Sequence, residues 1–204
     1  KFADKPAFKL KTEQEGVFKE ITYKEYVNDI NSLGTALISI GLKDKRIGVI
    51  GENRKEWELS YLSIVCGTGV VVPLDKALPE NEILSLIERS EIEAIFYSDK
   101  YNSVMEKVIK LGKDLLKNGA RSFLDAEIDN EKMSIMLFTS GTTSKSKAVA
   151  LSHKNICSNI YDISSVFDVG TEDTLLSFLP LHHTFESTVG FLYPVSIGAC
   201  VAFC

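Results

Sequence analysis

Short apolar runs alternate along the chain with segments whose apolar residues recur at helical spacing. The apolar runs are bounded by turn residues and predict buried strands at positions 46–50, 70–74, 94–97, 135–138, 148–151, 175–179 and 199–204. The helical spacing predicts helices at positions 22–41, 57–65, 79–87, 104–116, 153–167 and 186–197. This order predicts an α/β fold with predominantly parallel sheets flanked by helices.

The N-terminal part of the chain has a pattern of its own. Alternating apolar residues at positions 7–11 and 17–21 predict a β-hairpin. Thr22 and Glu25 then have the spacing of a capping box, which marks the start of a helix, and Gly41 suits its C-terminal cap. The apolar face of this helix is predicted to contain Val27, Ile30, Leu33 and Leu37.

A polar stretch after the apolar run 135–138 suggests a ligand-binding role rather than a role in packing. From Leu137 to His153 the chain reads L-F-T-S-G-T-T-S-K-S-K-A-V-A-L-S-H. Glycine lets successive N–H groups turn toward an anion, hydroxyls donate hydrogen bonds, and a lysine adds a compact positive charge. The stretch therefore suits a polyphosphate.

The residues of this stretch alone leave a second interpretation open. A Ser/Thr-rich segment between strands is more often a solvated connection, and composition by itself favours that role. The stretch is also not the P-loop of ordinary NTPases, because the second glycine of that motif would fall on Ser146.

Two blocks resemble the AMP-forming adenylating enzymes, which include acyl-CoA synthetases, luciferases and nonribosomal peptide adenylation domains. T-S-G-T-T with the following S-K-S-K-A-V-A-L-S-H is similar to the family's phosphate-binding signature, and L-P-L-H-H-T-F-E at 179–186 resembles a segment of long-chain fatty acyl-CoA synthetases. Blocks at 53–57 and 72–75 are also similar to the family, and we interpret them as packing and chain-turning segments.

The resemblance implies a fold, an activity and a set of site residues. Residues 1–204 would form part of the large N-terminal AMP-binding domain, without the small C-terminal domain. The activity would be that of a long-chain fatty acid:CoA ligase, whose substrates are a fatty acid, ATP and CoA. The phosphates would be bound by Thr139, Ser140, Gly141, Thr142, Thr143 and Lys147.

Two further roles follow from the same resemblance. Thr139 would also help to hold Mg²⁺, and His183 would orient the acyl carboxylate at the junction of the nucleotide and acyl sites. Glu186 is interpreted as a partner for a neighbouring cation that the sequence does not identify, and His153 as a structural or helix-capping residue.

The chain also departs from the family pattern T-S-G-T-T-G-x-P-K-G. Ser144, Ser146 and Ala148 replace two glycines and a proline, which changes the stiffness of the loop. Two alternatives therefore stay open: a ligase for another carboxylate, and a non-catalytic protein that binds acyl groups or nucleotides. A purely structural module, in which the loop has no function, agrees less well with two family blocks that occur in the family's order.

Composition limits the class of protein. A net charge of −5 and a pI near 5.3 argue against a nucleic-acid binder, and no run is long enough to span a membrane. We expect a cytoplasmic protein in which the four cysteines are free, buried thiols. Because the chain opens on lysine and lacks the family's C-terminal segments, we expect a fragment that is inactive alone.

Overall fold

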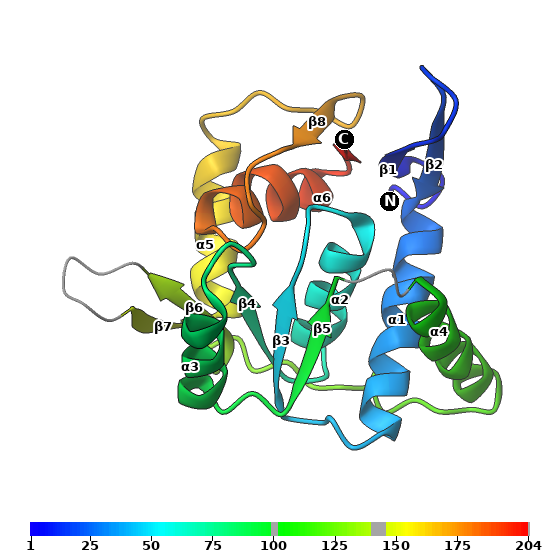
Figure 1. Cartoon of the computed structure of the whole chain (residues 1–204). Coiled ribbons are helices and arrows are strands. Elements are labelled where there is room, and N and C mark those ends of the chain that lie inside the picture. The colour runs from blue at the N-terminus through cyan, green and yellow to red at the C-terminus, as the bar shows by residue number, and fades with distance from the viewer. Residues whose placement is uncertain (99–101, 140–145, 204) are drawn as a thin grey trace.

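The computed structural model describes residues 1–98, 102–139 and 146–203 (Figure 1). The strands are β1 (Pro6–Lys11), β2 (Phe18–Thr22), β3 (Arg46–Ile50), β4 (Val70–Leu74), β5 (Ala94–Tyr97), β6 (Met133–Thr139), β7 (Lys147–Ser152), β8 (Thr174–Ser177) and β9 (Cys200–Phe203). The helices are α1 (Tyr23–Ser39), α2 (Lys55–Val65), α3 (Glu80–Ser90), α4 (Asn102–Lys117), α5 (His153–Ser164), the π-helix η1 (Glu186–Leu192) and α6 (Tyr193–Ile197).

The strands form two sheets that are mostly parallel, which confirms the predicted α/β class. The larger sheet has the order β5-β3-β4-β6-β7, and only β7 runs antiparallel to its neighbour. The smaller sheet has the order β2-β1-β9-β8, in which β1, β9 and β8 are parallel and β2 closes the N-terminal hairpin. The sequence pattern predicted the strands but did not divide them between two sheets.

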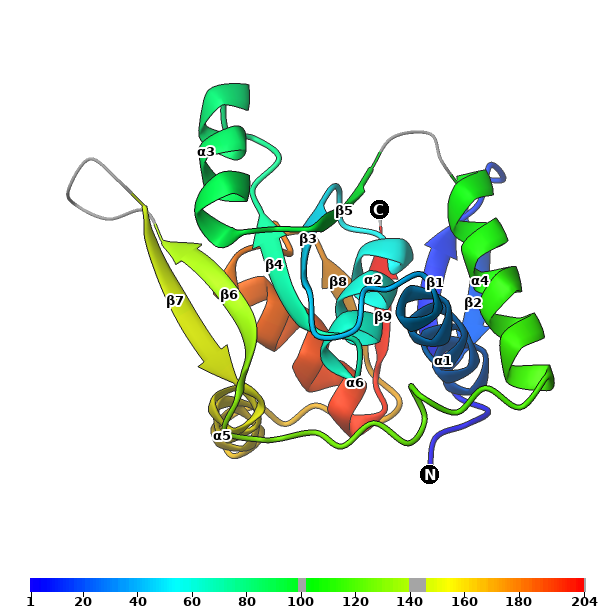
Figure 2. The same cartoon turned by 90° about the horizontal axis from the view of Figure 1, so that it is seen from below.

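Helices cover both faces of the larger sheet, as the alternation of its side chains requires. Val71 belongs to the main core on the side of α2, whereas its neighbour Val72 packs with Leu86 of α3. Figure 2 shows α2 and α3 on opposite sides of β3 and β4. Helix α1 packs against α4 and α2, and η1 packs against β8, α5 and α6.

An aromatic cluster links the smaller sheet to the first helix. The ring of Phe8 on β1 contacts Tyr26 of α1 with 4.5 Å between ring centroids, and Phe203 on β9 at 5.7 Å. The predicted apolar face is confirmed for Ile30, Leu33 and Leu37, which are buried. It is wrong at its first position, because Tyr26 is buried in place of Val27, which is 48% exposed. The predicted capping box is confirmed: the Thr22 hydroxyl accepts from the Glu25 N–H, and the Glu25 carboxylate accepts from the Thr22 N–H.

The last helical segment differs from the prediction. Instead of one α-helix over 186–197, the chain forms the π-helix η1 followed by the short helix α6. The carboxyl group of Glu186 occupies the space beside Gly190, where an added Cβ would lie 2.6 Å from it. The wider turn leaves room for a buried acidic side chain, and such turns are frequent at functional sites.

Two further observations concern predictions about the whole chain. None of the helices within the described ranges is long and apolar enough to cross a membrane. The expectation of buried thiols is wrong for Cys66 and Cys157, which are exposed, and right for Cys200. Cys204 lies outside the described residues.

Candidate functional site

A cleft of about 370 Å³ lies where β3, β4 and β8 end. Its walls include Asn53 after β3, Asp75 and Lys76 after β4, and Ser177 and His182 at and beyond the end of β8. The carboxyl ends of parallel strands are where ligands gather in open α/β sheets. The volume falls within the roughly 300–1,000 Å³ of small-molecule pockets, so the cleft is a candidate binding site.

Charged groups of both signs face this cleft. His182 Nε2 lies 3.5 Å from Asp75 Oδ2, and Lys76 Nζ lies 3.3 Å from Glu52 Oε1. Burial lowers the pKa of His182, the charge of Asp75 opposes that shift, and His183 adds to it. A hydrogen bond from the Ser98 hydroxyl lowers the pKa of Glu52, which therefore stays anionic.

His183, the histidine singled out by the motif, lies in the turn before η1. Its side chain is exposed, and its Nδ1 accepts a hydrogen bond from the Phe185 N–H at 3.4 Å. Its own N–H donates to the carbonyl of Pro180 at 2.9 Å. The neighbouring His182 lines the cleft, so the pair presents one ring to the cleft and one to solvent.

The predicted phosphate loop joins β6 to β7. Thr139 ends β6 and is paired across the hairpin with Lys147, and both residues are exposed. The hairpin thus places a hydroxyl opposite a lysine at the same carboxyl edge as the turn after β4. The remaining predicted loop residues, Ser140, Gly141, Thr142 and Thr143, lie outside the described residues.

Arg89 of α3 connects both sides of this hairpin. Its Nη2 donates to the carbonyl of Ser146 at 2.6 Å, and its guanidinium lies 5.5 Å from the centroid of the Phe138 ring. Figures 1 and 2 show β6 and β7 on the side of the molecule opposite α4. Within the described ranges, no hydrogen bond or ion pair joins His183 to Thr139 or Lys147.

A hydrogen-bonded chain behind the cleft connects the two sheets. Asn53 Nδ2 donates to Ser177 Oγ at 2.9 Å, and Ser177 Oγ donates to Glu186 Oε1 at 2.7 Å. The N–H groups of Phe178 and Leu179 also donate to the Glu186 carboxylate. Among the described residues the partners of Glu186 are therefore a hydroxyl and two backbone amides, and the interpretation of Glu186 as a cation partner stays a prediction.

A second buried carboxyl group lies close to Glu186. Glu58 of α2 is completely buried, and neither of its oxygens has a hydrogen-bond partner among the described residues. Burial raises its pKa well above the ordinary range, and the charge of Glu186 raises it further. Burial also raises the pKa of Glu186, although the donors from Ser177, Phe178 and Leu179 oppose that shift.

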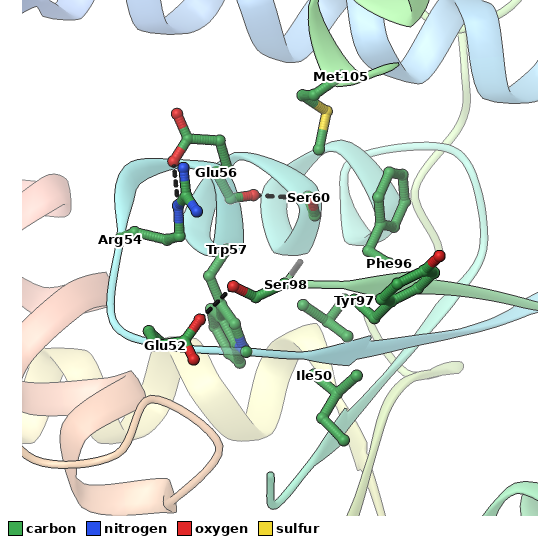
Figure 3. Close-up of a pocket in the computed structure, with 12 residues that line it drawn as sticks. Ile50, Glu52, Arg54, Glu56, Trp57, Ser60, Phe96, Tyr97, Ser98 and Met105 are labelled. Atoms are coloured by element: carbon green, nitrogen blue, oxygen red, sulfur yellow. Dashed lines mark hydrogen bonds and ion pairs between the residues drawn. The ribbon is translucent and has the colours of Figure 1, made fainter. Parts of the chain in front are cut away.

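A smaller hollow lies between α2, α4 and the ends of β3 and β5 (Figure 3). Trp57, Phe96 and Met105 line it, while Glu52 accepts from Ser98, and Arg54 pairs with Glu56 at 2.7 Å. Its volume is about 60 Å³, well below the ~150 Å³ of a cavity that takes up benzene. This hollow is therefore too small for a substrate.

The described residues provide no protein-only metal site. Among them there is no group of three or more His, Cys, Asp or Glu side chains that could hold a metal ion. Mg²⁺ is usually bound by substrate phosphates, water and one or two protein oxygens. The exposed hydroxyl of Thr139 fits that limited role, and a dedicated cage is not required.

The sequence alone did not identify some of these residues as members of the site. Asp75 and Asn53 were attributed to packing, although Asp75 directly follows the apolar strand β4 and Asn53 lies three residues after β3, which is a signal for a strand-end site. No sequence signal places Glu58 in the core. His153 has the predicted structural role, because its Nε2 lies 3.0 Å from the carbonyl oxygen of Val65.

Comparison with known proteins gives consistent results. The family model described as AMP-binding enzyme matches residues 1–204. The long-chain-fatty-acid–CoA ligase 5 of Rattus norvegicus is 30% identical over 213 residues, a match that covers 84% of this chain and 31% of the relative. The long-chain-fatty-acid–CoA ligase 1 of Homo sapiens is 27% identical over 84% of this chain and 30% of the relative.

Solved structures share the fold. ATP-bound MatB from Rhodopseudomonas palustris superposes with a TM-score of 0.80 at 23% identity, over 99% of this chain and 42% of that chain. A fatty acyl-adenylate ligase from L. pneumophila, in complex with acyl adenylate and pyrophosphate, superposes with a TM-score of 0.81 at 17% identity, over 98% and 37%. The chain spans about a third of the length of these curated ligases.

Proposed function

Because the chain belongs to the AMP-binding enzyme family, we propose that the protein it represents activates a long-chain fatty acid with ATP and transfers it to CoA. The observation that carries the choice of substrate is the 30% identity to a long-chain-fatty-acid–CoA ligase over 84% of this chain. The L-P-L-H-H-T-F-E block, which forms the turn beside the cleft, supports the same choice.

The reaction has two steps. A carboxylate oxygen attacks the α-phosphorus of ATP and pyrophosphate leaves, which gives an acyl-adenylate. The sulfur of CoA then attacks the acyl carbon, loses its proton and displaces AMP. Both steps depend mainly on positioning and on stabilisation of developing negative charge.

Residues of this chain would contribute to the first step. Lys147 and the hydroxyl of Thr139 face each other across the hairpin and would bind the phosphates, together with Ser140, Gly141, Thr142 and Thr143. Mg²⁺ bound with ATP would neutralise phosphate charge, with Thr139 as one oxygen ligand. His183 would orient the acyl carboxylate. Cytoplasmic location stays a prediction from the sequence.

The test is fatty-acid-dependent ATP–pyrophosphate exchange by the full-length protein. We expect exchange with long-chain acids and a fall of roughly 100-fold in kcat/KM for Lys147→Ala, because a charge-assisted phosphate contact is worth about 1.5–3 kcal/mol. Lys110→Ala, which removes an exposed lysine on α4, is the matched control and should retain wild-type exchange.

Three outcomes would count against the proposal. Exchange with other carboxylates but not with long-chain acids would identify a ligase of different specificity. No exchange from a folded protein would favour the non-catalytic binder. Wild-type exchange by Lys147→Ala would remove the proposed role of the β6–β7 hairpin.

A further inference from the structure

Asn53 makes contacts that its position in the sequence does not suggest. Its side-chain amide donates from Nδ2 to Ser177 Oγ at 2.9 Å and to the carbonyl of Leu179 at 2.5 Å. Its Oδ1 accepts from the N–H of Leu181 at 3.2 Å. One amide group thus contacts three positions on one short segment, 124 to 128 residues further along the chain.

That segment is held mainly by side-chain contacts: Leu181 is buried in the core, and His182 Nε2 lies 3.5 Å from Asp75 Oδ2. Residues 178–183 belong to no helix or strand, so no ladder of backbone hydrogen bonds fixes their path. Asn53 contacts the segment from one side, and from the other the Glu186 carboxylate accepts from Ser177, Phe178 and Leu179. His182 and His183 are the last two residues of the segment.

Asn53 also connects two sheets that share no strand pairing within the described ranges. It follows β3 of the larger sheet, whereas Ser177 ends β8 of the smaller sheet and its other two partners follow that strand. Both Nδ2 hydrogens and Oδ1 are used. An aspartate of the same shape would lose both donors and place a negative charge against the carbonyl of Leu179.

We propose that Asn53 is a positioning residue for the acyl-activating step: it fixes the 178–183 segment and thereby the direction of His183. This inference rests on the proposed function, because His183 has its role only there. Asn53 forms part of the wall of the cleft, and in this assignment it acts through the segment that it holds.

The experiment uses the full-length protein and four variants: Asn53→Asp, His183→Ala, their combination, and Asn81→Asp as control. Asn81 is exposed on α3, so it undergoes the same chemical change away from the cleft. ATP–pyrophosphate exchange is measured against acid and ATP, and hydrogen–deuterium exchange is followed over peptides that cover residues 178–184.

We expect Asn53→Asp to lower kcat roughly 10- to 100-fold, as small misplacements of a reacting group do, with the KM for ATP unchanged. The combined variant should be no slower than His183→Ala, because two residues that act through one group are not additive. Amide exchange in 178–184 should become about tenfold faster in Asn53→Asp, since the bonds to the Leu179 carbonyl and to the Ser177 hydroxyl just before the segment are lost. Asn81→Asp should change none of these.

Two results would overturn the inference. An Asn53→Asp loss that is equally large in the His183→Ala background would mean that Asn53 does not act through His183. Unchanged amide exchange in 178–184 would mean that Asn53 does not hold the segment. If the wild-type protein exchanges no pyrophosphate, the proposed function fails, and amide exchange alone decides whether Asn53 fixes the segment.

Discussion

Glu58 should make the stability of this protein depend on pH. Its carboxyl group is fully buried without a hydrogen-bond partner in the part of the chain that the structure describes, and burial raises its pKa well above the ordinary range. Glu186 receives hydrogen bonds from Ser177 and two backbone amides, so it ionises first, and its charge then opposes ionisation of Glu58. Glu58 is therefore protonated in the folded protein at pH values where the unfolded chain has released that proton.

The sign and size of this pH dependence follow from the linkage between proton binding and unfolding. An unfolded glutamate releases its proton near pH ~4.3. Above that pH the unfolded state binds fewer protons than the folded state, so the free energy of unfolding falls as pH rises, until the folded pKa is reached. The slope is about 1.4 kcal/mol per pH unit for one proton.

The assay compares wild-type protein with Glu58→Gln by urea unfolding at several pH values. The single tryptophan, Trp57, is buried and stacks on Tyr61, so its fluorescence reports on this core. Glutamine keeps the shape of the side chain but does not titrate, and Glu88→Gln on the exposed side of α3 is the control. The difference in unfolding free energy between wild type and Glu58→Gln should change by about 1.4 kcal/mol per pH unit. A difference that does not vary with pH would refute the reasoning, because Glu58 would then be ionised in the folded core.

Two further predictions test packing and the cleft. Gly112→Ala should destabilise the protein by about 1–3 kcal/mol, because a Cβ there would lie 1.7 Å from the carbonyl oxygen of Ser32 on α1. The control Gly170→Ala should change the melting temperature little, because its Cβ meets only Asp173 Oδ2 at 3.8 Å. Equal melting temperatures of the two variants would contradict the close approach of α1 and α4. His182 should titrate by NMR below the ordinary histidine value of ~6.5, and Asp75→Asn should lower its pKa further, because the charge of Asp75 raises it. An unchanged His182 pKa in that variant would show that His182 and Asp75 do not interact.

The sequence was sufficient to predict those elements whose structure depends on residues adjacent in the chain. The strands β3, β4 and β5 occupy the positions predicted from their apolar runs, and the capping box of α1 forms as its spacing indicates. Sequence patterns predict these elements correctly because the residues that form the pattern are the same ones that form the strand or the helix cap. The two family blocks likewise drew attention to the β6–β7 hairpin and the histidine turn through residue identities alone.

The remainder depends on partners that are distant in the chain. No local pattern shows that Asn53 contacts the segment before His182, or that Glu58 enters the core rather than the surface. The π-helix depends on the fit of Glu186 beside Gly190 within a packed core. Charged and amide side chains are normally assigned to the surface by composition, so sequence reasoning misses them when they are buried.

The pairing of β1 with β9 has a consequence for synthesis of the protein on the ribosome. Phe8 lies beside Val201, so the hairpin at the start of the chain waits for a partner about 190 residues later. At roughly 5–20 residues per second, that delay lasts about 10 to 40 s. The strands of the larger sheet all occur earlier, between Arg46 and Ser152, and can pair while the rest of the chain is still being synthesised. The smaller sheet, which leads to the histidine turn, is completed last.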